Sequence, residues 1–179
     1  ALVVLDRNTM EQVALWWGHI DEFELANVAY KLGTYYNEAL IGIERNNMGV
    51  AVVKKLDELG YKNQYRMEVL DELGMKVKDK LGWETNTRTR PILISDLNQV
   101  VFERQLIIRS SDIIGEMKSF VKGPSGKPEA QAGTHDDLVI ATGIAYQMYK
   151  SVPARIEPED IYVRNYKPNT TLGSLKGSK

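Results

Sequence analysis

The stretch Gly133-Thr134-His135-Asp136-Asp137-Leu138-Val139-Ile140-Ala141 places two adjacent carboxylates and an imidazole directly before an apolar run. This pattern predicts a loop that turns into a long helix over about 135–150. One carboxylate at a helix N-terminus is ordinary, because the helix dipole favours negative charge there. Two adjacent carboxylates repel each other unless a cation lies between them. We therefore expect this turn to bind a divalent metal ion.

A further acidic residue, Glu44, ends the apolar run 39–43, which predicts a short buried strand. The residues after it, Arg45-Asn46-Asn47-Met48-Gly49, suit a turn into a helix over 49–59. Acidic side chains from distant positions, each at the end of a strand or helix, are typical components of a divalent-metal site. We therefore expect Glu44 to lie close to the Asp136–Asp137 pair.

A structural interpretation exists for each of these residues. Thr134 and Asp137 have the spacing of a capping box, in which Asp137 would bond back to the backbone amide of the cap residue. Glu44 has the character of a solvated residue at a strand end. Neither interpretation accounts for His135 and Asp136, so the sequence leaves both readings open.

The other elements alternate between strand and helix patterns. After an opening hairpin, this alternation predicts an α/β fold with a mixed central sheet flanked by helices. Residues 1–152 form the expected domain, and the basic stretch 153–179 is expected to be a loosely ordered tail. The remaining expected elements are strands 1–6, 10–17 and 106–108, helices 21–33, 89–102 and 112–118, and a hairpin over 119–133.

Composition narrows the functional classes. The chain of 179 residues has no cysteine, which excludes disulfides and thiolate metal sites. No apolar run reaches membrane-spanning length, so we expect no membrane partner. The net charge of −1 means that any nucleic-acid contact must use a local basic patch. The candidates for such a patch are Arg45, Asn46, Arg88, Arg90, Lys122 and Lys127, for which a solvated surface is the alternative.

Five segments occur in an order that resembles one known family. They are "ALVVLDRNTMEQVALWWG", "IGIERNNMG", "LGWETNTRTRP", "EMKSFV" and "GTHDDLVIATGIAY". Together they are similar to the C-terminal nuclease domain of the large terminase subunit of tailed bacteriophages, over residues 1–150. The resemblance implies an RNase H-like fold and metal-dependent cutting of concatemeric viral double-stranded DNA during genome packaging.

The resemblance also implies roles for individual residues. Glu44 matches the second acidic position of the family, and Asp136 and Asp137 match the acidic pair that opens the last helix. His135 matches a neighbouring histidine that orients a carboxylate or contacts the scissile phosphate. We expect the three carboxylates to bind two Mg²⁺ or Mn²⁺ ions. The family's first acidic residue lies on a strand before Ala1, so we expect that strand and ligand to be missing from the sequence.

The implied partners are an N-terminal ATPase domain of the same polypeptide, the portal and the small terminase subunit, at the assembling capsid in the host cytoplasm. Two alternatives remain from the residues alone. One is another RNase H-like nuclease, such as a junction resolvase or a transposase. The other is a non-catalytic module that docks on DNA or on a portal.

Overall fold

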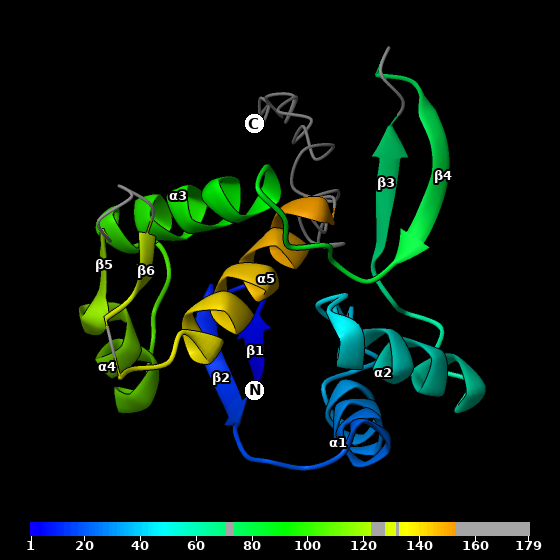
Figure 1. Ribbon diagram of the computed structural model, residues 1–179. Helices are drawn as coiled ribbons and strands as arrows, with labels where there is room; N and C mark the ends of the chain where they lie inside the picture. The colour runs from blue at the N-terminus through cyan, green and yellow to red at the C-terminus, as the bar shows by residue number, and fades with distance from the viewer. Residues whose placement is uncertain (71–73, 123–127, 132, 153–179) are drawn as a thin grey trace, which may run out of the picture.

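The computed structural model describes residues 1–70, 74–122, 128–131 and 133–152 (Figure 1). The turn of the last hairpin, including Lys127, and the basic tail 153–179 lie outside these residues. In chain order the elements are β1 (Leu2–Asp6), β2 (Glu11–Trp16), α1 (Glu22–Tyr35), α2 (Asn47–Glu58), β3 (Arg66–Leu70), β4 (Lys76–Leu81), α3 (Thr89–Phe102), α4 (Ser111–Ser119), β5 (Phe120–Lys122), β6 (Pro128–Ala130) and α5 (Asp137–Ser151).

Local sequence signals account for the hairpin and helix boundaries. The Asp6 carboxylate accepts hydrogen bonds from the backbone N–H groups of Asn8 and Thr9, at 2.8 and 2.9 Å, which closes the expected turn between β1 and β2. Asp21 and Ser110 accept backbone hydrogen bonds as the N-caps of α1 and α4. The helices predicted over 21–33, 49–59, 89–102, 112–118 and 135–150 are all present, with ends within about two residues of the prediction.

The strands do not form one continuous sheet within the described residues. β1 pairs with β2, β3 with β4, and β5 with β6, each as an antiparallel pair. The strand predicted over 39–43 is instead an extended segment, joined to its neighbours by single parallel bridges from Ile41 and Glu44. The strand predicted over 106–108 is likewise reduced to one bridge, at Ile107. Residues 39–44 do not pair with β1 because a cavity separates the two segments.

α5 is the central element of the fold. It packs against β1, α3 and α4, as Figure 1 shows. Trp83 and Leu93 meet Ile140, Ile144 and Met148 of α5 in a buried cluster. A fully buried side chain of this kind contributes about 1.5–3 kcal/mol, so this helix carries much of the core.

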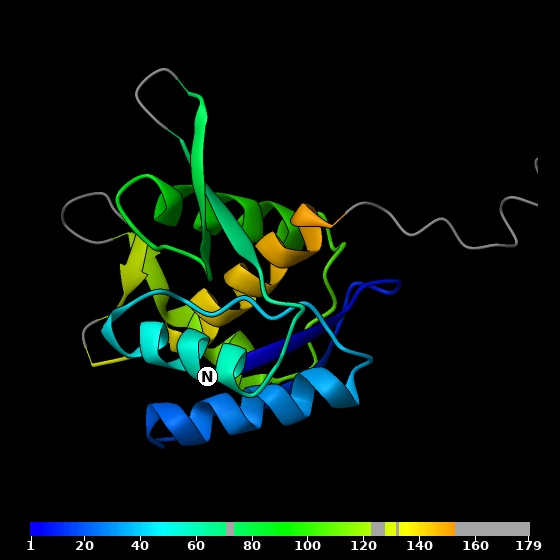
Figure 2. The ribbon, with the colours of Figure 1, turned by 90° about the vertical axis from the view of Figure 1, so that its right-hand side faces the viewer.

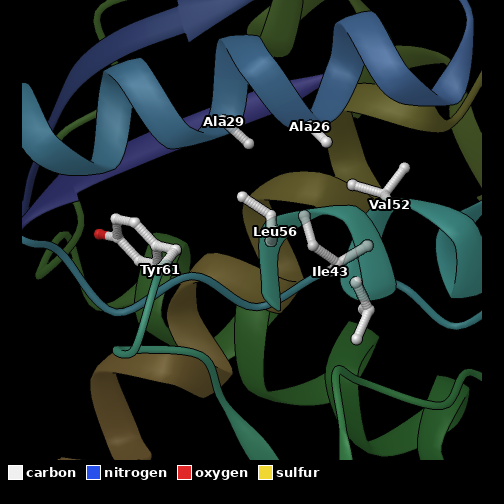
Figure 3. Packing of buried hydrophobic residues seen from close by; sticks show 7 residues of the cluster. Ala26, Ala29, Ile43, Val52, Leu56 and Tyr61 are labelled. Carbon is white, nitrogen blue, oxygen red and sulfur yellow. The ribbon is translucent and has the colours of Figure 1, made fainter. Parts of the chain in front are cut away.

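A separate cluster joins α1 to α2, which lie side by side (Figure 2). Ala26 and Ala29 of α1 face Val52 and Leu56 of α2, and Tyr61 closes one end of the cluster (Figure 3). Ile43 also belongs to this cluster, so the segment that ends at Glu44 is anchored beneath by a buried side chain. None of the helices in the described ranges is long and apolar enough to cross a membrane.

Candidate active site

The predicted acidic residues line one cavity. It has a volume of about 820 Å³ and runs between β1 and residues 36–44, with side chains of α1 and α5 along its walls. Glu44, Asp136 and Asp137 all contribute to its lining, together with Arg90. Residues separated by almost a hundred positions in the chain therefore line the same cavity, while their close approach stays a prediction.

Backbone contacts hold Glu44 in place. The Ile43 carbonyl accepts a hydrogen bond from Trp83 N–H at 2.7 Å, and Arg45 N–H donates to the Trp83 carbonyl at 2.6 Å. On the opposite side, Gly49 packs so tightly that a Cβ atom there would lie 1.7 Å from the Glu44 carbonyl oxygen. Only glycine can sit this close to the Glu44 carbonyl. Gly49 therefore fixes the position of Glu44 relative to the start of α2.

The Asp136–Asp137 pair lies at the N-terminus of α5, but neither side chain caps this helix by the predicted capping box. α5 begins at Asp137, and the Thr134 hydroxyl donates to the Gln131 carbonyl at 2.7 Å. The capping-box interpretation is therefore wrong. The cap comes from α4, because the Glu116 carboxylate accepts backbone hydrogen bonds from Leu138 at 2.8 Å and Val139 at 3.3 Å. Sequence reasoning missed Glu116, since no local spacing links it to α5.

Asp136 has a different partner. The Arg90 guanidinium, from the first turn of α3, donates to its carboxylate at 2.6 Å and forms an ion pair. The side chains are 35% and 31% exposed, respectively, so the pair is half-buried. Asp137 and His135 are exposed. The three acidic residues of the cavity are thus Asp136, whose carboxylate is engaged, an exposed Asp137 and a half-buried Glu44.

The other predicted DNA contacts have varied surroundings. The Arg45 guanidinium donates to the Leu81 carbonyl at 2.8 Å, and the Asn46 side chain accepts from Gly49 N–H at 2.8 Å as the N-cap of α2. Arg88 is exposed beside Arg90. Lys122 ends β5, although its side chain lies outside the description. These residues remain predicted contacts.

The donor set suits a hard divalent cation, because three carboxylates line one cavity and the helix N-terminus does not use the aspartate side chains. Within the described residues, however, no group of three carboxylate or imidazole side chains lies close enough to hold an ion. The ion pair of Asp136 with Arg90 is one reason, since it directs that carboxylate towards α3. The chemistry of the three carboxylates therefore fits Mg²⁺ or Mn²⁺. Their side chains do not, however, lie close enough together to surround an ion.

Tyr61 anchors the far end of the segment that leads to Glu44. Its hydroxyl donates to the Ala39 carbonyl at 2.5 Å, and the side chain is 2% exposed. Burial, with smaller contributions from the negative charge of Glu38 and from Tyr30, raises the pKa of Tyr61 to about 12. The neutral hydroxyl is thus the form that the folded protein favours.

Comparisons with known proteins support the fold. No model of a known protein family matches the chain. No curated protein matches it either. Among solved structures, the chain is similar to the large terminase nuclease from thermophilic phage G20c, with a TM-score of 0.61 and 20% sequence identity. The match covers 81% of this chain and 72% of that one. The resemblance inferred from the sequence motifs is confirmed at the level of the fold, because the chain shares the α/β fold of that terminase nuclease.

Proposed function

We propose that this chain is the nuclease domain of a phage large terminase, which cuts concatemeric viral double-stranded DNA during genome packaging. The observation that carries the proposal is that Glu44, Asp136 and Asp137 line the same cavity. The fold likeness to a terminase nuclease adds support, because the same architecture there belongs to a nuclease. Fold alone does not determine function, so the acidic residues carry the chemical argument.

In this proposal the three carboxylates hold Mg²⁺ or Mn²⁺, in two sites. When bound, the ions supply an activated water and stabilise the leaving oxygen of the phosphodiester. The protein contributes rigid placement of the ligands. Gly49 and the Trp83 backbone fix Glu44, and Glu116 fixes the turn that bears the two aspartates. His135 is exposed next to the pair and is available to contact the scissile phosphate.

Binding of the substrate rests on phosphate contacts. Arg88 and Arg90 lie at the start of α3, where Arg90 contacts Asp136, and guanidinium groups match the geometry of phosphate oxygens. Phosphate contacts carry no direct sequence information, so we expect weak sequence preference. We further propose that the domain works with an ATPase domain of the same polypeptide, the portal and the small terminase subunit, at the capsid in the host cytoplasm.

Plasmid digestion tests the function. Wild type should cut supercoiled plasmid with Mn²⁺ and should not cut it with EDTA, and Asp137→Ala should lose cutting. The matched control is Asp112→Ala, because Asp112 is an exposed aspartate in the first turn of another helix, α4. Equal cutting by wild type and Asp137→Ala would remove the site assignment.

The choice of substrate separates the proposal from its alternatives. A terminase nuclease should cut linear duplex at least as well as a four-way junction, whereas a junction resolvase should prefer the junction. A docking module would bind DNA equally well with Mn²⁺ or EDTA and would cut neither substrate.

A further inference from the structure

One basic residue is in direct contact with an acidic residue of the cavity. Arg90 bonds to Asp136 at 2.6 Å, and both side chains line the cavity that Glu44 and Asp137 also line. The two partners belong to different helices, since Arg90 lies in the first turn of α3 and Asp136 immediately precedes α5. The contact therefore bridges the two elements that flank the site.

The starts of α3 and α5 are both held by hydrogen bonds other than the Arg90–Asp136 contact. Glu116 already caps α5, so its N-terminus does not depend on the Asp136 side chain. The first turn of α3 is fixed by Asn86, whose side chain accepts backbone hydrogen bonds from Arg88 and Thr89. By contrast, Arg45 uses its guanidinium to hold the Leu81 carbonyl. Arg90 is thus free to exchange partners without unravelling either helix.

Electrostatics favour such an exchange. A partly exposed ion pair contributes little to stability, so a stronger competitor can separate it. A divalent ion held by Asp136 would neutralise the carboxylate and repel the guanidinium. A duplex brings phosphate oxygens, which accept paired hydrogen bonds from arginine.

We propose that Arg90 exchanges between two anions: it binds Asp136 while the site is free of metal, and it binds a DNA phosphate when a divalent ion holds Asp136. The inference rests on the proposed nuclease function and adds an energetic link between its two ligands. Because such coupling is reciprocal, metal strengthens DNA binding through Arg90, and DNA strengthens metal binding to the same extent.

The first test compares Arg90→Gln with wild type in two solutions of equal ionic strength, one with Mg²⁺ and one with EDTA. The probe is a short fluorescent duplex with phosphorothioate linkages, which resists cleavage, and fluorescence anisotropy gives the affinity. Arg90→Gln should bind DNA about two- to fivefold more weakly than wild type with Mg²⁺ and equally well with EDTA. The control is Arg88→Gln, which removes the same charge at an exposed neighbouring position and should change the two affinities by one common factor.

A second pair of variants tests the release of Arg90 without any metal. Asp136→Asn and Asp137→Asn each remove one negative charge from the same turn, but Asp136 holds the guanidinium. With EDTA, Asp136→Asn should therefore bind the duplex more tightly than Asp137→Asn. Thermal melts of all variants, followed by circular dichroism, establish that each is folded.

Metal binding to the protein alone provides an independent measurement. Mn²⁺ titration followed by electron paramagnetic resonance should give an equal or tighter dissociation constant for Arg90→Gln, because the competing guanidinium has been removed. The exchange is overturned if Arg90→Gln weakens DNA binding equally in Mg²⁺ and EDTA, or if it weakens Mn²⁺ binding. If wild type binds neither Mn²⁺ nor duplex, the proposed function fails as well. If it binds both without mutual enhancement, only the exchange fails.

Discussion

The carboxylate of Glu116 accepts a hydrogen bond of 2.8 Å from the backbone N–H of Leu138, so α4 supplies the cap of α5. A helix leaves its first N–H groups without internal partners, and a side-chain oxygen from elsewhere can satisfy them. In this chain the acidic pair stands at the same helix end. The cap from Glu116 therefore leaves the pair available for other ligands.

Replacing Glu116 with alanine should destabilise the fold. The variant leaves the N–H groups of Leu138 and Val139 unpaired, at a cost of about 1–2 kcal/mol. Glu116→Gln retains an acceptor oxygen and should lose less. Urea unfolding measures both, with Glu103→Ala as the control at an exposed position. Equal losses for Glu116→Ala and Glu103→Ala would contradict this account of the cap.

Replacing two helical glycines with alanine should change the stability of the protein in opposite directions. A Cβ at Gly143 in α5 would lie 2.2 Å from a Leu93 methyl group, so Gly143→Ala should destabilise the protein by about 1–3 kcal/mol. A Cβ at Gly115 in α4 would meet nothing within 4 Å, so Gly115→Ala should stabilise it by about 0.5–1 kcal/mol. Chemical denaturation of the two variants checks the difference in sign, and a shared sign would refute the packing argument.

Gly49→Ala should impair cleavage through Glu44. The added methyl group would collide with the Glu44 carbonyl, so this segment must shift and carry the carboxylate away from the two aspartates. We expect at least a tenfold loss of plasmid cutting, because small displacements of catalytic groups are costly. Val50→Ala, at an exposed neighbouring side chain outside the cavity lining, is the control. Unchanged cutting by folded Gly49→Ala would show that the close approach has no functional role.

Tyr61 should make the protein sensitive to alkaline pH. Its pKa is raised to about 12, so its contribution to stability is complete below pH 10 and is lost as the pH rises through 12. Tyr61→Phe should cost about 1 kcal/mol at neutral pH through the lost bond to Ala39, and its stability should fall less between pH 10 and 12. Unfolding curves at several pH values test this, with the exposed Tyr35→Phe as the control. Parallel declines in all three proteins would exclude Tyr61 as the cause.

Much of the local structure could be predicted because its causes are local. Asp6 and Asp21 signal a turn and a helix start through bonds to residues two or three positions away. The apolar spacing of α5 gave its extent to within two residues. The acidic residues were proposed as a site because two adjacent carboxylates repel each other at a helix start, and this proposal stays a prediction.

The features that could not be predicted depend on long-range contacts. Arg90 and Asp136 are 46 positions apart, and Glu116 lies 22 positions before the amide that it caps. The segment 39–43 has the composition of a strand, yet a strand needs paired neighbours, and β1 faces it across a cavity. Periodicity identifies a buried segment but does not identify the segments beside it.

The enclosure of α5 has a consequence for its dynamics. Eight of its residues, from Leu138 to Met148, are buried, and Thr142 is fully so. Amide protons in the middle of such a helix exchange with deuterated solvent only through global unfolding, whereas those of a less enclosed end exchange through local fraying. Lys150 and Ser151 are exposed, so fraying is expected at the C-terminal end of α5, whereas the acidic pair adjoins the buried end that Glu116 caps.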